Sequence, residues 1–107
     1  FNRELSHATV KVPKKGDFRV QEEHGADLSS VTPDELLVAT GNRVMSLVDP
    51  MPVYARADFV RAPDGRFLVM ELELIEPSMY LRMDPRAPER FADAFNRYVE
   101  QNEGATQ

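Results

Sequence analysis

The feature that most constrains the fold is the dipeptide Asp64-Gly65, which separates two runs of strand-forming residues. The first run covers residues 53–60 and the second covers residues 67–75. Asp-Gly between two such runs is the strongest short-range signal for a β-hairpin, because glycine adopts positive φ without steric cost. The sequence therefore predicts two antiparallel strands joined by a tight turn.

A second pair of antiparallel strands is predicted before this hairpin. Residues 4–12 form an extended run that ends at Pro13, and a polar turn follows it. Residues 17–23 alternate, with Phe18 and Val20 on one face. An alternation with a period of two residues is typical of a half-buried strand.

The first helix is predicted to start at a capping box. Thr32 serves as the cap, Pro33 takes the first helical position, and Glu35 completes the T-x-x-E pattern. Gly41 weakens the middle of the helix, which indicates close packing there, and Pro50 marks its end. The predicted buried stripe consists of Leu36, Leu37, Thr40, Val44, Leu47 and Val48.

A second helix is predicted from residue 85 or 88 to residue 101, with Asp84 as its cap. Residues 102–107 form a polar tail that we expect to fray. The order β-β-α-β-β-α predicts an α+β fold, an antiparallel sheet with helices packed on one face. The predicted apolar face of the second helix consists of Phe91, Phe95, Tyr98 and Val99.

Composition limits the classes of function. The chain has 107 residues, which suits one domain, and its net charge of −5 argues against nucleic-acid binding through a general positive field. It contains no cysteine, so thiolate metal sites and cysteine nucleophiles are excluded. No apolar run is long enough to span a bilayer and no leader is evident, so we expect a cytoplasmic protein. Phe1 in place of Met indicates a piece of something longer.

The hairpin carries the most informative side chains. A two-residue turn at 64–65 would place Asp58 opposite Glu71 and Arg56 opposite Glu73, all on one face. Opposed like charges destabilise a sheet, and oxygen ligands of this kind suit Mg²⁺ or Mn²⁺. The alternative is a solvated face on which Arg56 pairs with Glu73, and a one-residue slip would turn one set of carboxylates away. The opposite, core face would consist of Ala55, Ala57, Phe59, Leu68, Met70, Leu72 and Leu74.

Arg19 is a candidate for anion recognition. It projects from a predicted strand beside Lys11, and a guanidinium can hold a phosphate or carboxylate with two parallel hydrogen bonds. The alternative is a surface arginine that pairs with Glu22 or Glu23.

Two segments together resemble the C-terminal part of an ATP-grasp ligase. VKVPKKGDFRVQEEHGA is similar to the segment that carries a phosphate-contacting arginine, and ARADFVRAPDGRFLVMELELIEPSMYL is similar to the metal-binding hairpin of that family. The chain is similar to the group of bacterial glutathione synthetase and the ribosomal-protein-glutamate ligases, which includes the cycloserine-forming ligase. The resemblance covers most of residues 4–99.

The resemblance implies a role for each matching residue. Asp58 would bind a metal ion, Glu71 would bridge two Mg²⁺ ions, and Glu73 would stand where the family usually has asparagine. Arg19 would hold the γ-phosphate and the acyl-phosphate intermediate, with Lys11 nearby as a second phosphate contact. ATP and Mg²⁺ or Mn²⁺ are the implied cofactors, and small-molecule carboxylates and amines are the implied substrates.

The resemblance also implies a division of the chain. Residues 1–101 would be the C-terminal subdomain of a longer ATP-dependent carboxylate–amine ligase, inactive by itself because the lobes that hold the adenine lie elsewhere. Two alternatives stay open, a non-catalytic module that binds a divalent cation and an acidic module that docks a basic protein. A homo-oligomer is a further option that the sequence leaves open.

Overall fold

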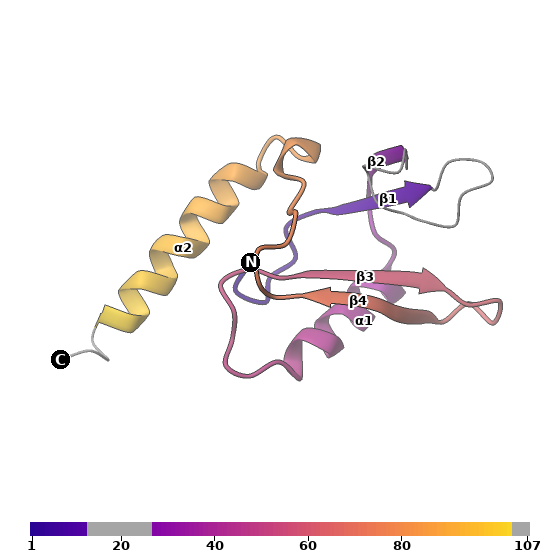
Figure 1. Cartoon of the computed structure of the whole chain (residues 1–107), viewed down its shortest axis with the longest axis horizontal. Helices are drawn as coiled ribbons and strands as arrows, with labels where there is room; N and C mark the ends of the chain where they lie inside the picture. Colours follow the sequence, from indigo (N-terminus) through magenta and orange to yellow (C-terminus); the bar gives the residue numbers. More distant parts are fainter. Residues whose placement is uncertain (13–26, 104–107) are drawn as a thin grey trace.

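The α+β class is confirmed. The structure is a computed structural model that describes residues 1–12 and 27–103 (Figure 1). Its strands pair into two antiparallel two-stranded sheets, β1 with β2 and β3 with β4, rather than into a single sheet. In chain order the elements are β1 (Ala8–Val12), β2 (Asp27–Val31), α1 (Glu35–Ser46), β3 (Arg56–Arg61), β4 (Phe67–Glu73), η2 (Leu81–Met83) and α2 (Ala87–Glu103).

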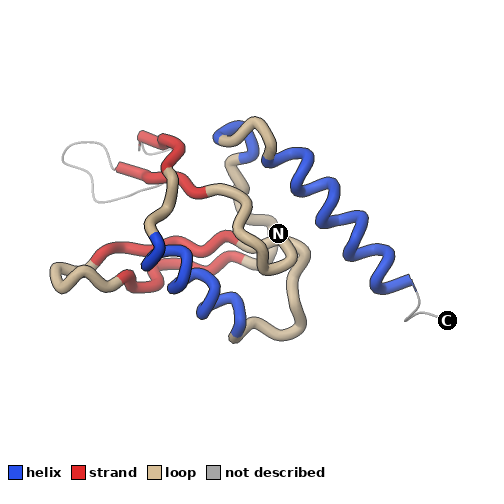
Figure 2. Tube along the Cα trace, turned by 180° about the vertical axis from the view of Figure 1, so that it is seen from behind, coloured by secondary structure: helices blue, strands red, loops and turns tan. Residues whose placement is uncertain are grey.

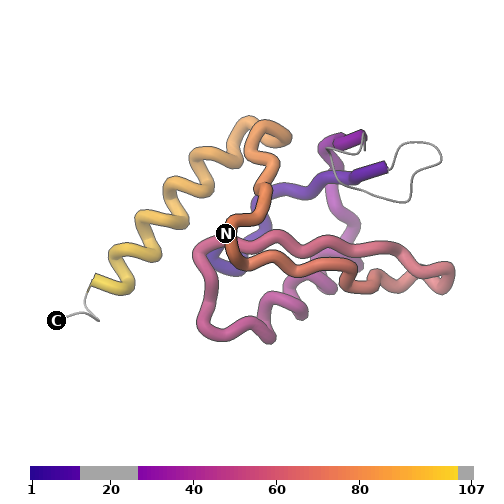
Figure 3. The backbone as a smooth tube through the Cα atoms, viewed as in Figure 1, coloured from indigo at the N-terminus to yellow at the C-terminus, as the bar shows by residue number. Residues whose placement is uncertain are grey.

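The hairpin β3–β4 is the centre of the arrangement. Helix α1 lies across one side of it, as the view from behind shows (Figure 2), and the pair β1–β2 lies beside it. Helix α2 leads away from the strands and gives the molecule its long axis of 55 Å (Figure 3). Among the described residues, α1 therefore covers the hairpin, and α2 packs beside it against the N-terminal segment.

The loop of the hairpin contains three residues, so the predicted two-residue turn is wrong. The backbone N–H of Ala62 donates to the carbonyl of Arg66 at 2.7 Å, and that of Gly65 donates to the carbonyl of Ala62 at 2.9 Å. Gly65 adopts φ +90°, a conformation that side chains disfavour. A three-residue loop with glycine at the positive-φ position is the next most common hairpin connection.

A β-bulge between Asp58 and Phe59 compensates for the longer loop. Below the bulge the predicted register is confirmed, with Asp58 opposite Glu71. Above it Phe59 lies opposite Val69, one residue away from the predicted partner. Directly paired residues share a face, so Val69 and its neighbour Leu68 exchange the faces that strict alternation assigned to them.

Helix α1 is capped by Asp34 and not by Thr32. The Asp34 carboxylate accepts a hydrogen bond from the backbone N–H of Leu37 at 2.8 Å. It also pairs with Arg61 at the end of β3, so the cap fastens the helix to the hairpin. Aspartate is at least as good a cap as threonine, and here tertiary pairing adds to that preference.

The predicted stripe of α1 is partly confirmed, since Leu37, Thr40, Val44 and Val48 are half-buried. Leu36 and Leu47 are 48% and 80% exposed, and the helix ends at Ser46, before the prolines. A Cβ at Gly41 would meet nothing within 4 Å, so the predicted close packing there is wrong. Leu37, Val38, Gly41 and Met45 of the helix line a cavity beside β3.

In the described part of the chain, β1 pairs with β2. Strand β1 is the last part of the predicted run 4–12, and it pairs with β2, which the sequence pattern did not indicate. Strand β2 has the sequence DLSSV and is mostly exposed, so it lacks the apolar alternation by which strands are recognised. The predicted strand at residues 17–23 lies outside the described residues.

Helix α2 packs against the N-terminal segment of the chain. The rings of Phe1 and Phe91 meet edge to face at 5.2 Å, and the Asn2 side chain donates to the carbonyl of Ala94. Phe95 is 49% exposed, so the predicted apolar face is only partly correct. The helix begins at Ala87 and ends two residues beyond the predicted end, at Glu103.

Few side chains are fully enclosed. Among the described residues only Ala87 and Ala94 of the apolar side chains are buried. Within the same part of the chain, no helix has both the length and the apolar character that crossing a membrane requires.

The two described glycines give a matched test of the fold. An added Cβ meets nothing within 4 Å at either position, so only backbone preference decides the effect. We expect Gly65→Ala to lower the free energy of unfolding by about 1–2 kcal/mol, because of the positive φ. We expect Gly41→Ala to raise it by about 0.5–1 kcal/mol, because alanine favours the helix. Urea unfolding of both variants measures the difference, and the same sign for both would contradict the hairpin loop described above.

Candidate functional site

Three carboxylates lie together on one face of the hairpin and form what we call the carboxylate cluster, Asp58, Glu71 and Glu73. Asp58 comes from β3, and the two glutamates come from alternate positions of β4. The pairing of Asp58 with Glu71 and of Arg56 with Glu73 puts all three on the same face. The side chain of Asp58 is 23% exposed and that of Glu71 is 52% exposed, so the cluster opens toward solvent at Glu71.

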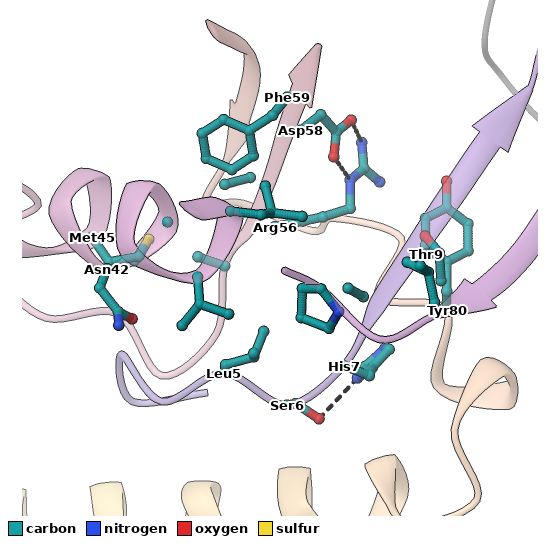
Figure 4. Close-up of a pocket in the computed structure, with 18 of the residues that line it drawn as sticks. Leu5, Ser6, His7, Thr9, Asn42, Met45, Arg56, Asp58, Phe59 and Tyr80 are labelled. Atoms are coloured by element: carbon teal, nitrogen blue, oxygen red, sulfur yellow. Dashed lines mark hydrogen bonds and ion pairs between the residues drawn. The ribbon is translucent and has the colours of Figure 1, made fainter. Parts of the chain in front are cut away.

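Arg56 holds the carboxylate cluster together. Its Nε and Nη2 donate to the two oxygens of Asp58 at 2.9 and 3.1 Å, a bidentate pair (Figure 4). The same Nη2 lies 3.2 Å from Glu73 Oε1 and 3.5 Å from Glu71 Oε2. Its Nη1 donates to the backbone carbonyl of Ser78 at 3.0 Å. One guanidinium thus contacts both strands and the segment that follows them.

Lys11 and Tyr80 complete the surroundings of the cluster. Lys11, from β1, reaches Asp58 at 4.0 Å and lies 4.8 Å from the centre of the Tyr80 ring. The Arg56 guanidinium lies 5.5 Å from the same ring. Both distances suit cation–π attraction. Tyr80 adopts φ +48°, a left-handed conformation that is uncommon for a bulky side chain.

The surroundings raise the pKa of both Arg56 and Glu71, which favours the charged form of the arginine and the neutral form of the glutamate. Burial disfavours the Arg56 cation, but the hydrogen bonds and charge of Asp58 outweigh it and raise the pKa of Arg56. The pKa of Glu71 is also raised, first by its hydrogen bond with Glu73, then by desolvation and by the charges of Glu73 and Asp58. Arg56 opposes that rise. The cluster is therefore crowded with negative charge in spite of the guanidinium.

The cluster contains ligand types that suit a divalent cation, but its side chains are not arranged around a metal position. Carboxylate oxygens are the ligands that Mg²⁺ and Mn²⁺ prefer, so the donor set fits these ions. In the described part of the chain, however, no three histidine, cysteine, aspartate or glutamate side chains already converge to hold a metal ion. The carboxylates converge on the Arg56 guanidinium instead.

The predicted site residues divide into two groups. Lys11, Asp58, Glu71 and Glu73 lie together, while Arg19 falls outside the described residues. Their roles stay predictions.

Sequence reasoning assigned no site role to Arg56 or Tyr80. The R-x-D spacing was the available signal for Arg56, because residues two apart on a strand share a face. No sequence signal pointed to Tyr80, because a segment distant from β1 brings its ring to Lys11.

A cavity of about 840 Å³ adjoins the cluster. It runs between α1, β1, β3 and the N-terminal segment, with Asn42 and Met45 on one side and Thr9 and Tyr80 on the other (Figure 4). Arg56 and Asp58 line it as well, whereas Glu71 and Glu73 do not, so the cluster borders this space, which is large enough for a small molecule, through Asp58 alone.

Comparison with known proteins gives a partial match. The chain is 36% identical over 90 residues to the cycloserine biosynthesis protein DcsG of Streptomyces lavendulae. The match covers 84% of this chain and 29% of that protein, so the chain spans less than a third of its relative. No protein-family model matches the chain, and no solved structure matches it. The chain is therefore similar to one portion of a protein of a biosynthetic pathway.

The raised pKa of Glu71 predicts an unusual pH dependence. A carboxyl group whose pKa is raised by folding favours the folded state while protonated, so its contribution falls as pH rises from the ordinary value of 4.5 through the raised pKa. We expect Glu71→Gln to gain stability relative to the unsubstituted chain over that rise in pH. Urea unfolding at a series of pH values measures the difference.

Glu100→Gln, on an exposed position of α2, removes the same charge away from the cluster and is the matched control. A stability difference for Glu71→Gln that is independent of pH, or one equal to that of Glu100→Gln, would contradict the crowding of charge at the cluster.

Proposed function

We propose that this chain is the portion of an ATP-dependent carboxylate–amine ligase that handles the phosphates. The observation that carries the proposal is the common position of Asp58, Glu71 and Glu73 on one face of the hairpin, with Lys11 beside Asp58. The similarity to a portion of a cycloserine biosynthesis protein supports a biosynthetic enzyme. The resemblance to ATP-grasp ligases supplies the class of reaction.

In the proposed reaction, ATP transfers its terminal phosphoryl group to a substrate carboxylate. An amine then attacks the acyl phosphate, forms the C–N bond and releases phosphate. The work of this chain is positioning and neutralisation of charge, which is the main contribution of proteins to phosphoryl transfer. Lys11 and Arg19 would contact phosphate oxygens, and Arg19 would also stabilise the charge on the transferred group.

Mg²⁺ or Mn²⁺, held by the carboxylate cluster, would neutralise charge on the phosphates when bound. The donor chemistry of the three carboxylates fits these ions, and the exposed side of the cluster at Glu71 leaves room for nucleotide oxygens. The small-molecule carboxylate and amine substrates, and the cytoplasmic location that such a ligase would have, belong to the same proposal.

The first test uses turnover by the whole enzyme that contains this chain. We expect Glu71→Gln to slow ADP release by about 10²–10³-fold, because removing one electrostatic contact from the transition state typically has that effect. The matched control is Glu100→Gln, which we expect to leave turnover unchanged. Near-normal ADP release by Glu71→Gln would refute the assignment of the cluster to phosphoryl transfer.

The second test uses the 107-residue chain itself. We expect ATP, with or without Mg²⁺, to raise its melting temperature little, because the adenine-binding lobes of an ATP-grasp enzyme are not among these residues. A thermal-shift series with Mg²⁺, with ATP and with both measures this. A large rise with Mg²⁺ alone would favour a non-catalytic cation-binding module. Salt-sensitive binding to a basic protein without any metal response would favour an interaction module.

A further inference from the structure

We infer that the cavity between α1, β1 and β3 binds the carboxylate substrate, and that this substrate is a monocarboxylate with a bulky apolar side chain. The inference rests on the proposed function and deepens it, since it names the class of carboxylate that receives the phosphoryl group. The apolar side chain of the substrate would fill the cavity, and its carboxylate would lie beside Lys11.

The size of the cavity suits a small organic molecule. Its volume is about 840 Å³, and ligand pockets generally have volumes of roughly 300–1,000 Å³. The N-terminal segment, α1, β1 and β3 all contribute to its walls. A ligand in this space would contact several elements at once, and burial of its apolar surface would supply affinity.

Apolar side chains form most of the walls of the cavity. Leu5 comes from the N-terminal segment, Leu37 and Met45 come from α1, Phe59 comes from β3, and Met79 comes from the segment after β4. Figure 4 shows Leu5, Met45 and Phe59 around the same space. Methionine side chains are flexible and polarisable, so they adapt to the shape of a ligand. Such walls favour an aliphatic or aromatic body over a polar one, which would lose its hydrogen bonds with water.

Lys11 places a cation at the wall of this apolar space. Its side chain lines the cavity and is only 17% exposed. Its Nζ lies 4.0 Å from Asp58 Oδ2, which is longer than a hydrogen bond, and 4.8 Å from the centre of the Tyr80 ring. Neither contact is a conventional hydrogen bond, so the ammonium group can still donate to an acceptor in the cavity. A ligand carboxylate would form a charge-assisted hydrogen bond there, strengthened by the low exposure.

The acidic side chains around the cavity do not cancel the charge of Lys11. Of the acidic residues that the structure describes, three line the cavity. Asp58 accepts a bidentate pair from Arg56 at 2.9 and 3.1 Å, a closer partner than Lys11. The side chains of Glu4 and Asp34 are 72% and 53% exposed, and each pairs with an arginine of its own. The surroundings of Lys11 therefore favour an anionic group on the ligand.

Apolar walls with one available cation define the class of ligand. One carboxylate would pair with Lys11, whereas a second charged group would be buried against apolar side chains, which is unfavourable without a partner. The site therefore favours monocarboxylates over dicarboxylates. The position also agrees with the proposed reaction, in which Lys11 contacts phosphate oxygens. A carboxylate beside Lys11 would lie next to the phosphoryl group that it receives.

The first experiment titrates the 107-residue chain with phenylvalerate and follows its methionine methyl groups by ¹³C NMR. Met45 and Met79 line the cavity, whereas Met51 and Met83 do not. We expect the ring current of the phenyl group to shift the signals of Met45 and Met79 and to leave those of Met51 and Met83 unchanged. Because the protein is unsubstituted, the result does not depend on the folding of a variant.

The second experiment repeats the titration with variants and with phenylvaleramide, the neutral amide of the same acid. We expect Lys11→Gln to weaken phenylvalerate binding about tenfold, because a hydrogen bond to a charged group typically contributes that much. We expect the same variant to leave phenylvaleramide binding unchanged. Leu37→Gln should weaken binding of both probes, and the matched control Leu36→Gln should weaken neither, since the Leu36 side chain does not line the cavity and is 48% exposed. Circular dichroism verifies that each variant is folded.

The outcomes separate the inference from the proposed function. Shifts confined to Met45 and Met79, with an effect of Lys11→Gln on the acid alone, support the inference. Absence of shifts, equal shifts of all four methionines, or an equal effect of Lys11→Gln on acid and amide overturns it. The proposed function is tested separately by ADP release from the whole enzyme. Slow ADP release by Glu71→Gln without phenylvalerate binding would keep the ligase and remove this substrate class. Near-normal ADP release with phenylvalerate binding intact would refute the ligase and, with it, the substrate role of the cavity.

Discussion

The arrangement of this site depends on one ion-paired group, the Arg56 guanidinium. Two strands that carry opposed acids would repel each other at this position, by up to about 1 kcal/mol for a directly opposed pair. Arg56 offsets that repulsion, since it contacts Asp58 on its own strand and both glutamates on the other. It also fixes the segment after β4 through the carbonyl of Ser78. The hairpin and the chain that follows it are thus joined at the same place where the acids are gathered.

The site is also the place where the two sheets meet. Lys11 reaches from β1 to Asp58 on β3, and the Tyr80 ring lies against both Lys11 and Arg56. Few side chains are fully buried in the described part of the molecule, so such polar and aromatic contacts carry more of the arrangement than they would in a larger core.

Much of the hairpin could be predicted because its signals are local. Alternation along a strand determines which of its side chains share a face, so the common face of Glu71 and Glu73 was predictable, and the predicted pairing of Asp58 with Glu71 is also found. The loop was predicted one residue too short, and the bulge at Phe59 restored the register below it. A pattern with a period of two residues reveals neither the three-residue loop nor the bulge, since both leave the composition of the strands unchanged. Strand β2 was missed because DLSSV has no apolar alternation and forms through its pairing with β1.

The sequence by itself determined the α+β class, the hairpin and the common face of Glu71 and Glu73, because these follow from residue order within short segments. The tertiary structure decided, through the loop and the bulge, that Asp58 joins that face. It also decided that the Arg56 guanidinium contacts all three acids and that the Tyr80 ring lies beside that guanidinium. Asp34 rather than Thr32 caps helix α1, and Asp34 also pairs with Arg61 at the end of β3. Such contacts join residues far apart in the chain, and their energies depend on distances that only the folded arrangement supplies.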